Sequence, residues 1–178
     1  MRVAVLRLGH RKDRDKRVTT HVCLAARALG ADFAIISGER DDRVIKSVAG
    51  VSQRFGGRFF ARHEPNYRKA VARLKKGGYS IVHLTMYGEP LEKMIGAVRR
   101  KRKVCVIVGA GKVPRDVYEM ADYNISVTGQ PHSEFAAIAI FLHELFFGKE
   151  LSKKFPNARL RVVPQARGKK VMARGKKG

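Results

Sequence analysis

The stretch Val104–Val127, VCVIVGAGKVPRDVYEMADYNISV, contains two apolar, β-branched runs separated by a glycine-containing turn and a short helical segment. The pattern predicts strands over Val104–Val108 and Tyr123–Val127 and a helix over Pro114–Ala121. A strand, a helix and a second strand in this order form a βαβ unit, in which the two strands lie parallel in one sheet. This unit indicates an α/β fold.

The same alternation runs through the rest of the chain. Further strands are predicted at Arg2–Leu8, Phe33–Ser37, Arg58–Ala61 and Ser80–Thr85, and further helices at Thr20–Leu29, Asp41–Val48, Asn66–Lys76, Leu91–Val98 and Pro131–Phe147. The apolar strands predict a mostly parallel sheet with helices on both faces. We expect a single α/β domain over residues 1–166, followed by a basic, flexible tail over residues 167–178, which hold six bases and no acid.

The charge balance points to a polyanionic partner. The chain has 38 Lys and Arg against 15 Asp and Glu, a net charge of +23, which favours nucleic acid over other partners. The apolar runs are too short for a signal peptide or a membrane helix, so we expect a cytoplasmic protein without a membrane partner. Cys23 and Cys105 are typical of reduced core residues, and the scattered histidines predict no metal site.

The turn Gly109–Val113 has the composition of a phosphate-binding loop but not its spacing. A P-loop requires Ser or Thr after the lysine, and Val113 follows Lys112 instead. A dinucleotide-binding turn requires a third glycine where Pro114 stands. An ordinary strand-to-helix turn without a ligand is an open alternative.

Three loops follow predicted strands and should meet at one edge of the sheet. They are Met86–Pro90, Gly109–Val113 and Thr128–Glu134, and ligands of parallel sheets bind beyond the carboxyl ends of the strands. In the last loop, Gly129 supplies backbone freedom, and Pro131 suits a first helical turn whose amides are free to donate.

The side chains of His132, Ser133 and Glu134 can bond either a ligand or the free amides of the helix that follows them. That helix, Pro131–Phe147, is apolar nearly all round. It is therefore expected to pack either in the core or against a partner subunit.

Residues 7–17 hold six Lys or Arg and two Asp, in what the pattern predicts to be a loop after the first strand. Such a loop can bind RNA phosphates or be merely solvated. The candidate RNA-binding residues are Arg11, Arg14, Lys16 and Arg17. The basic run Arg99–Lys103 is either a second RNA contact or a solvated helix end. Arg27 lies in an apolar helix and requires a partner there, either a carboxylate or a substrate.

Five blocks in the same order carry a resemblance to a known family. They are LRLGHRKDRDKRVTTHVCLAARALGA, HLTMYG, VGAGKVPRDVYEMADYNISV, GQPHSEFAAIAIFL and RLRVVPQARGKKV. Together, over nearly the whole chain, they resemble the archaeal tRNA cytidine-56 2′-O-methyltransferases, a family of the SPOUT superfamily of knotted methyltransferases.

The resemblance implies a homodimer with a deep C-terminal trefoil knot that binds S-adenosylmethionine. It implies a tRNA (cytidine-56-2′-O)-methyltransferase, which methylates the ribose 2′-hydroxyl of a cytidine in the TΨC loop of tRNA. Arg27 falls where the superfamily's first motif places its catalytic arginine. The implied cofactor-binding residues are Leu84, Gly109, Ala110, Gly111, Lys112, Val113, Val127, Thr128, Gly129, Gln130, Pro131, His132, Ser133 and Glu134.

The chain departs from the family pattern at a few positions. An acidic residue is expected where Gly111 stands, Gly-Asn where Thr128 and Gly129 stand, and Asp where His143 stands. Two other functions stay open: an RNA-binding module of the same fold without activity, and a methyltransferase that acts on another RNA or on a base.

Overall fold

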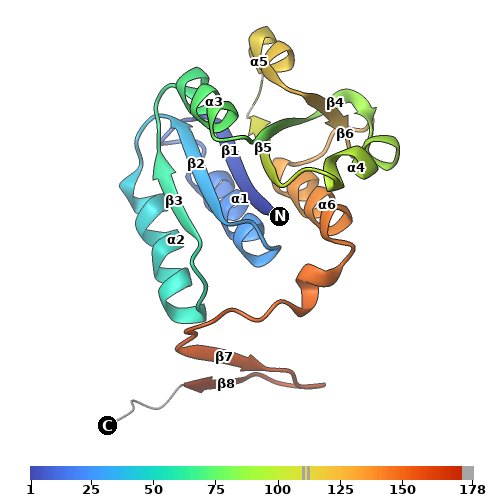
Figure 1. Ribbon diagram of the computed structural model, residues 1–178. Coiled ribbons are helices and arrows are strands. Elements are labelled where there is room, and N and C mark those ends of the chain that lie inside the picture. The colour runs from blue at the N-terminus through green and yellow to red at the C-terminus, as the bar shows by residue number, and fades with distance from the viewer. Residues whose placement is uncertain (110, 112, 174–178) are drawn as a thin grey trace.

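In the computed structural model, which describes residues 1–109, 111 and 113–173, the chain builds one six-stranded sheet (Figure 1). Its strands are β1 (Arg2–His10), β2 (Phe33–Gly38), β3 (Phe60–His63), β4 (Ser80–Pro90), β5 (Lys103–Gly109) and β6 (Tyr123–Ser126). The order across the sheet is β3-β2-β1-β5-β4-β6, and every pair of neighbours is parallel. The predicted parallel sheet is confirmed.

Helices cover both faces of this sheet, as predicted. They are α1 (Lys16–Ala28), α2 (Asp42–Phe55), α3 (Tyr67–Lys76), α4 (Leu91–Arg99), α5 (Arg115–Met120), α6 (Glu134–Phe146) and the short 3₁₀ helix η1 (Lys149–Ser152). One core joins the sheet to α1, α2, α4 and α6, and a second core joins its other face to α3 and α5. The two cysteines are buried, one in each core, and burial raises the pKa of both the Cys23 and the Cys105 thiols to about 12.

Successive residues of β1 point alternately into the two cores, because the side chains of a strand repeat every two residues. Val3 and Val5 face the α1 and α6 side, and Ala4 and Leu6 face the α3 side. Arg7 continues the first series. Its fully buried side chain therefore enters the core between the sheet and the helices α1 and α6.

The loop predicted over residues 7–17 is much shorter than expected, and its predicted extent is wrong. β1 includes Arg7, as predicted, but continues through Gly9 to His10, and α1 begins at Lys16, so Lys16 and Arg17 belong to the helix. A glycine near the end of the strand and the charged first turn of the helix concealed the two boundaries. Arg7 keeps an inward position in the strand because it has acidic partners, which its own neighbourhood in the sequence does not reveal.

The last long helix starts later than predicted. α6 begins at Glu134 rather than at Pro131, and Ser133 is its N-cap, with a hydroxyl that accepts a hydrogen bond from the Ala136 amide (3.3 Å). The predicted place of Pro131 in the first helical turn is therefore wrong, because the chain becomes helical only after the serine cap. For Ser133, the expected capping role is confirmed.

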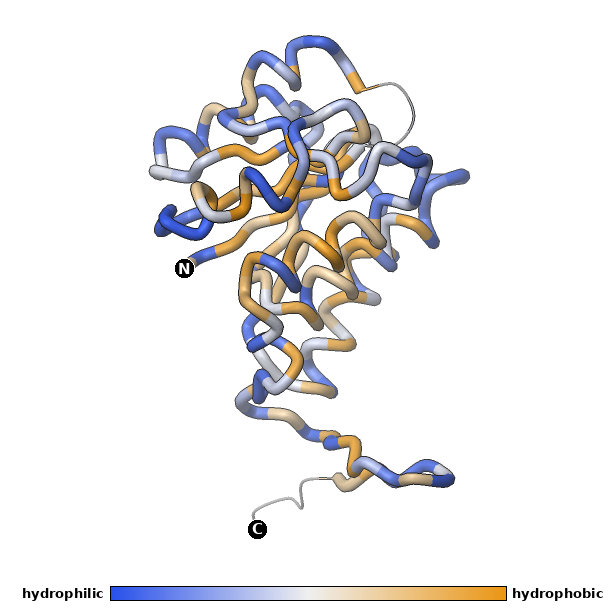
Figure 2. The backbone as a smooth tube through the Cα atoms, turned by 90° about the vertical axis from the view of Figure 1, so that its right-hand side faces the viewer, coloured by the Kyte–Doolittle hydropathy of each residue, from blue (hydrophilic) through white to orange (hydrophobic). Residues whose placement is uncertain are grey.

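A C-terminal hairpin was not predicted. β7 (Leu160–Val163) and β8 (Lys170–Ala173) pair antiparallel and project away from the sheet (Figures 1 and 2). The expected domain boundary at residue 166 falls in the loop of this hairpin, and residues 174–178 of the expected tail lie outside the described residues. The trefoil knot implied by the resemblance stays a prediction. Among the helices that the structure describes, none is both long and apolar enough to cross a membrane.

Candidate active site

A cavity of about 710 Å³ lies at the carboxyl ends of β4 and β5, beside the loop that leads into α6. Its volume is in the range of small-molecule binding sites. The lining comes from all three loops expected to meet there: Met86 and Tyr87 from the first, Gly109, Gly111 and Val113 from the second, and Pro131, His132, Ser133 and Glu134 from the third. The predicted meeting of these three segments is confirmed, but Met86–Pro90 belongs to β4 and not to a loop.

Only part of the expected cofactor-binding set lines this cavity. Leu84, Gly109, Gly111, Val113, Pro131, His132, Ser133 and Glu134 line it, whereas Val127, Thr128, Gly129 and Gln130 do not. Ala110 and Lys112 lie outside the described residues. The lining also includes residues that sequence reasoning missed: Val18, His83, Thr85, Val108, Tyr118, Phe135 and Ala137. For His83, the sequence did contain a signal: a polar residue in the middle of an apolar strand.

Two glycines shape the turn after β5. Gly111 has a φ of +65°, a left-handed conformation that favours glycine. At Gly109, an added Cβ would lie 2.5 Å from Val113 Cγ2, so a side chain there requires Val113 to move. At Gly129, an added Cβ would meet nothing within 4 Å. The protein itself therefore requires glycine at Gly109 and Gly111 but not at Gly129.

His83 is a fully buried side chain of the cavity wall, held in one tautomer by Asn124. The Asn124 amide donates from Nδ2 to the Tyr118 carbonyl oxygen (3.0 Å), which turns its Oδ1 toward His83 Nδ1 (2.9 Å). His83 Nδ1 is therefore the protonated nitrogen. Nε2 is buried and has no hydrogen-bond partner among the described residues. Burial also lowers the pKa of His83, which leaves Nε2 as a neutral acceptor.

The acidic side chain of the lining, Glu134, is bound by a buried arginine. Arg7 Nε lies 2.8 Å from Glu134 Oε2, and Arg7 Nη2 lies 4.0 Å from Asp15 Oδ2. Because an isolated buried charge is unfavourable, the two carboxylates account for the position of Arg7 inside the fold. Burial raises the pKa of Glu134, although Arg7 opposes this shift.

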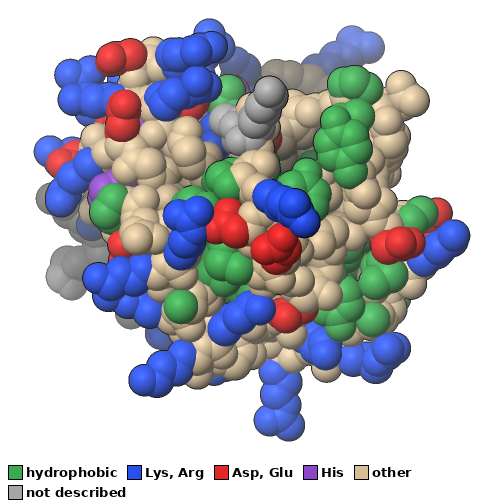
Figure 3. Space-filling model, turned by 90° about the horizontal axis from the view of Figure 1, so that it is seen from above, with side chains coloured by type: hydrophobic (Ala, Val, Ile, Leu, Met, Phe, Trp, Pro, Cys, Tyr) green, Lys and Arg blue, Asp and Glu red, His purple; other side chains and the backbone are tan. Residues whose placement is uncertain are grey.

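The predicted RNA-binding residues Arg11, Arg14, Lys16 and Arg17 are all exposed. Asp15 holds this segment in place: it accepts hydrogen bonds from the Arg11 amide (3.1 Å) and from Arg11 Nε (3.0 Å). Figure 3, a view onto the carboxyl edge of the sheet, shows Lys and Arg side chains around the rim of this face. The contact between Asp15 and Arg7 connects the basic segment to Glu134 and the cavity.

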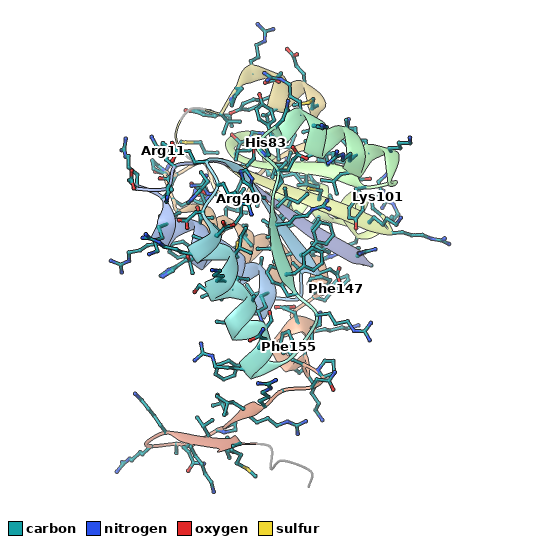
Figure 4. All side chains as sticks on the ribbon, turned by 90° about the vertical axis from the view of Figure 1, so that its left-hand side faces the viewer. Arg11, Arg40, His83, Lys101, Phe147 and Phe155 are labelled. Atoms are coloured by element: carbon teal, nitrogen blue, oxygen red, sulfur yellow. The ribbon has the colours of Figure 1, made fainter. Side chains whose placement is uncertain are left out.

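The structure does not bring Arg27 to this cavity. Arg27 Nη2 donates to the Gly56 carbonyl oxygen (2.7 Å), Nε donates to Ser52 Oγ (3.3 Å), and the guanidinium lies 4.8 Å from the centre of the Phe155 ring. Along α1, Arg27 is about 13 Å from Val18, the residue of that helix that lines the cavity. Figure 4 shows Phe155 at the opposite end of the molecule from His83 and Arg11.

The basic run Arg99–Lys103 lies at the other edge of the sheet, where β5 begins. Arg99 Nε donates to the Glu144 carbonyl oxygen (3.1 Å), and its guanidinium lies over the Phe147 ring. Lys103 Nζ donates to the Gly77 carbonyl oxygen (2.8 Å). These contacts favour the interpretation of Arg99–Lys103 as the end of a helix rather than as a second RNA contact. Within the described part of the chain, no group of three His, Cys, Asp or Glu side chains could hold a metal ion.

The chain is similar in sequence to one protein family. Residues 55–172 match the family model of the tRNA ribose 2′-O-methyltransferase, aTrm56. A tRNA (cytidine(56)-2′-O)-methyltransferase of Methanopyrus kandleri is 54% identical over 170 residues, which cover 96% of each chain. The enzyme of the same name from Thermococcus kodakarensis is 52% identical over 174 residues, again 96% of each chain.

Solved structures resemble the fold at low sequence identity. An RNA 2′-O ribose methyltransferase matches with a TM-score of 0.62 at 18% identity, over 83% of this chain and 57% of the other. A TrmH/SpoU tRNA modifying enzyme of A. aeolicus matches with a TM-score of 0.57 at 14% identity, over 85% and 78%. The methyltransferase AviRb of Streptomyces viridochromogenes, crystallised with AdoMet, gives a TM-score of 0.57 at 14% identity, over 83% and 57%. These likenesses support the α/β architecture described above.

Proposed function

The chain belongs to the aTrm56 family of tRNA ribose 2′-O-methyltransferases, and we propose that it methylates the ribose 2′-oxygen of cytidine 56 in tRNA, with S-adenosylmethionine as the methyl donor. The observation that carries this function is the likeness to the Methanopyrus kandleri enzyme, which spans 96% of both chains at 54% identity. The cavity at the carboxyl edge of the sheet supports it independently.

The cavity suits a nucleoside with an amino-acid tail. Leu84, Val108 and Val113 give it an apolar wall for a flat base, and Gly109 and Gly111, which have no side chains, line it with backbone. His83 Nε2, buried without a partner in the described structure, can accept a hydrogen bond from an amino or hydroxyl group. When bound, S-adenosylmethionine supplies an activated methyl group on a sulfonium sulfur.

The exposed bases beside the cavity are proposed to bind tRNA. Arg11, Arg14, Lys16 and Arg17 can pair with phosphates, and the contact of Arg11 with Asp15 connects the segment to Arg7 and the cavity wall. Because phosphate contacts carry no sequence information, these residues set the position of the tRNA rather than the choice of nucleotide.

A ribose hydroxyl is a weak nucleophile, so the protein must align it and stabilise the charge that develops on its oxygen. The catalytic role of Arg27 stays a proposal: its guanidinium lowers the energy of the developing alkoxide and binds the neighbouring phosphate. Arginine keeps its proton in proteins, so Arg27 is not the base in this scheme. Within one subunit Arg27 lies away from the cavity, so that this role requires the ribose to be presented to it by a partner subunit.

We also propose a homodimer and a cytoplasmic location. The dimer is supported by apolar side chains on the outer surfaces of α1 and α6: Val18, Phe135 and Ile140 are 37%, 39% and 46% exposed. His21 and Phe135 connect the two helices there, with ring centres 5.8 Å apart. The cytoplasmic location follows from the tRNA substrate of the family.

The decisive experiment incubates the protein with labelled S-adenosylmethionine and an unmodified tRNA transcript, followed by nuclease digestion and mass spectrometry. The expected product carries one methyl group on the ribose of cytidine 56. A transcript with 2′-deoxycytidine at that position is the matched control and should accept no label. Label in the control indicates a base or another nucleotide as the target, and calorimetry without S-adenosylmethionine binding indicates an RNA-binding module.

A further inference from the structure

We propose that Glu134 is the general base of this reaction: its carboxylate takes the proton of the ribose 2′-hydroxyl as that oxygen is methylated. The inference rests on the proposed function and adds the proton acceptor, which the family resemblance does not supply. Four observations carry it: the position of Glu134 on the cavity wall, the orientation of its carboxylate, its connection to the basic segment, and its electrostatic surroundings.

One carboxylate oxygen of Glu134 is buried beside Arg7, in a side chain that lines the cavity. Oε2 is fully buried, 2.8 Å from Arg7 Nε, while the side chain as a whole is 18% exposed. Oε1 is not among the buried oxygens of the described residues that lack a hydrogen-bond partner, and the residue lines the cavity, so Oε1 is the oxygen that we assign to the reaction. Because Glu134 opens α6 behind the Ser133 cap, its backbone is fixed by a long helix. Residues on rigid elements hold reacting groups more accurately than residues on loops.

Glu134 also lies where the two proposed substrates must meet. Arg7 connects it to Asp15, and Asp15 holds Arg11 through its amide and its guanidinium. The exposed bases of that segment are the proposed phosphate contacts. A ribose whose phosphate is bound there and whose hydroxyl faces the methyl donor has Glu134 as its neighbouring carboxylate.

The surroundings make this carboxylate a stronger base than a solvated one. Burial raises the pKa of Glu134, the negative charge of Asp15 acts in the same direction, and Arg7 acts against both. A base is most effective when its pKa approaches the working pH. Arg7 and Asp15 are the charged groups that act on Glu134, Arg11 contacts Asp15, and His132 of the preceding loop lines the same cavity.

His132 is the main rival. Its Nδ1 lies 2.7 Å from the Gln130 carbonyl oxygen, which leaves Nε2 free to accept a proton. Its side chain is, however, exposed and is held only by its own loop. Glu134 instead has a buried counterion and a helical backbone, and we therefore assign the role to the glutamate.

The step balances as follows. The O2′–H bond breaks and its proton passes to Glu134 Oε1, while the oxygen's electron pair forms the new bond to the methyl carbon. The carbon–sulfur bond breaks, and its pair returns to sulfur as a neutral thioether. The protonated Glu134 then releases its proton to water, which restores the carboxylate for the next cycle.

The first test is Glu134→Gln, which keeps the size of the side chain and removes the proton acceptor. The single-turnover methylation rate of the parent should rise with pH at the acidic side of the pH–rate profile. This acidic limb reports the deprotonation of one group. The Gln variant should react about 10²–10⁴-fold more slowly and lack this limb. Affinity for S-adenosylmethionine is measured by calorimetry in parallel, and the rates are compared at saturating S-adenosylmethionine, so that a loss of cofactor binding is not mistaken for a loss of the base. His132→Gln tests the rival base and should keep the limb. Glu92→Gln, the same exchange at an exposed position in the first turn of α4, is the matched control and should keep both the rate and the limb.

A second test does not depend on turnover. Carbon-13 NMR of the Glu134 carboxyl in the free protein gives its titration midpoint directly, and this midpoint should coincide with the kinetic limb. Asp15→Asn removes a neighbouring negative charge and should shift both midpoints to lower pH by the same amount. If Glu134→Gln does not fold, the comparison of the kinetic and NMR midpoints in Asp15→Asn still tests whether Glu134 is the base.

The outcomes separate the two proposals. A parent that methylates no tRNA overturns the proposed function, and this inference with it. If the parent is active and Glu134→Gln keeps the rate or the limb, only the role of Glu134 is wrong. Loss of the limb in His132→Gln assigns the proton to the histidine instead. An Asp15→Asn variant whose kinetic limb does not follow the NMR midpoint also overturns the inference.

Discussion

Arg27 illustrates how far a single residue can be interpreted from its neighbours in the sequence. An arginine among alanines requires a partner, and the partners found are a carbonyl oxygen, a hydroxyl and an aromatic ring. We expect Arg27→Lys to lower the free energy of unfolding by about 1–3 kcal/mol, because lysine keeps the charge but loses the planar, forked donor. Urea unfolding of the parent and the variant measures this difference.

The same variant tests the catalytic proposal for Arg27. Methylation is compared per folded molecule, at a temperature where both proteins are fully native. A slower methylation rate in Arg27→Lys than in the parent supports contact of the Arg27 guanidinium with the reacting ribose. A parental rate together with lowered stability assigns Arg27 to the support of Gly56 and Phe155 alone. Ser52→Ala, which removes one hydrogen-bond partner of Arg27, is the control for the structural effect.

His83 predicts a pH dependence of stability. Burial holds its pKa below the ordinary value, so the folded protein binds this proton less readily than the unfolded chain does. The neutral His83 therefore makes its full contribution to stability above its unfolded pKa, about 6.5. The unfolding free energy decreases as the pH falls below that value. We expect the unfolding free energy of His83→Gln to depend less on pH in this window. His132→Gln, at an exposed site, should keep the parental slope, and an unchanged slope in His83→Gln would contradict the prediction.

Arg7 shows why part of the site was out of reach of sequence reasoning. Its immediate neighbours, Leu6 and Leu8, are apolar, and the pattern places it in the first strand without showing why an arginine points inward there. Its partner Glu134 begins the last long helix, and only the packed fold brings the two together. By contrast, glycines after an apolar strand indicate a turn from local sequence alone, and Gly109, Gly111 and Val113 of that turn line the cavity.

At the scale of elements, the order and type of every strand and helix of the main sheet followed from periodicity. The ends were less accurate where an element lacks an apolar pattern: α2 runs to Phe55 beyond Val48, and β4 runs to Pro90 through a register shift after Leu84. The C-terminal hairpin was missed because its residues are basic and mostly exposed. The pairs Leu160–Ala173 and Val162–Val171 do place apolar side chains on one face, but each strand has only four residues, too few for the alternation to be recognised in the sequence.

The hairpin is expected to serve binding more than stability. Residues 160–178 contain seven Lys or Arg and no acid, and Val162, Val171 and Met172 are all more than half exposed. The anchoring contacts lie before it: Gly57 N donates to the Pro156 carbonyl oxygen (2.8 Å) and Arg159 N to that of Arg54 (2.9 Å).

Truncation after Arg159 should therefore leave the melting temperature and the affinity for S-adenosylmethionine nearly unchanged while weakening tRNA binding. Each lost phosphate contact lowers the salt slope of the binding constant by about 0.7–0.9. Fluorescence anisotropy over a salt series measures this slope. A truncated protein that binds tRNA with the parental slope removes the hairpin from the RNA interface, and one that unfolds shows that it stabilises the domain.

At the scale of the molecule, the sequence predicts which layers form but not how the strands are arranged. The order β3-β2-β1-β5-β4-β6 inserts β5 between β1 and β4, a choice made by long-range packing. This order sets β5 next to β1, and thereby brings the turn Gly109–Val113 near the basic segment and Glu134. The proposed active site thus depends on contacts between parts of the chain that are far apart in the sequence.

The proposed dimer gives the last prediction. Ile140 lies on α6 and is 46% exposed, beside the similarly exposed Phe135. Ile140→Glu places a charge on this face without altering the core, so the variant should fold normally by circular dichroism. Burying an unpaired carboxylate at a subunit interface is strongly unfavourable, and about 2.7 kcal/mol already weakens association about 100-fold. Sedimentation velocity should therefore find a dimeric parent and a monomeric variant. Ser47→Glu, which adds the same charge to an exposed site on α2, should remain dimeric; a dimeric Ile140→Glu would place the interface elsewhere.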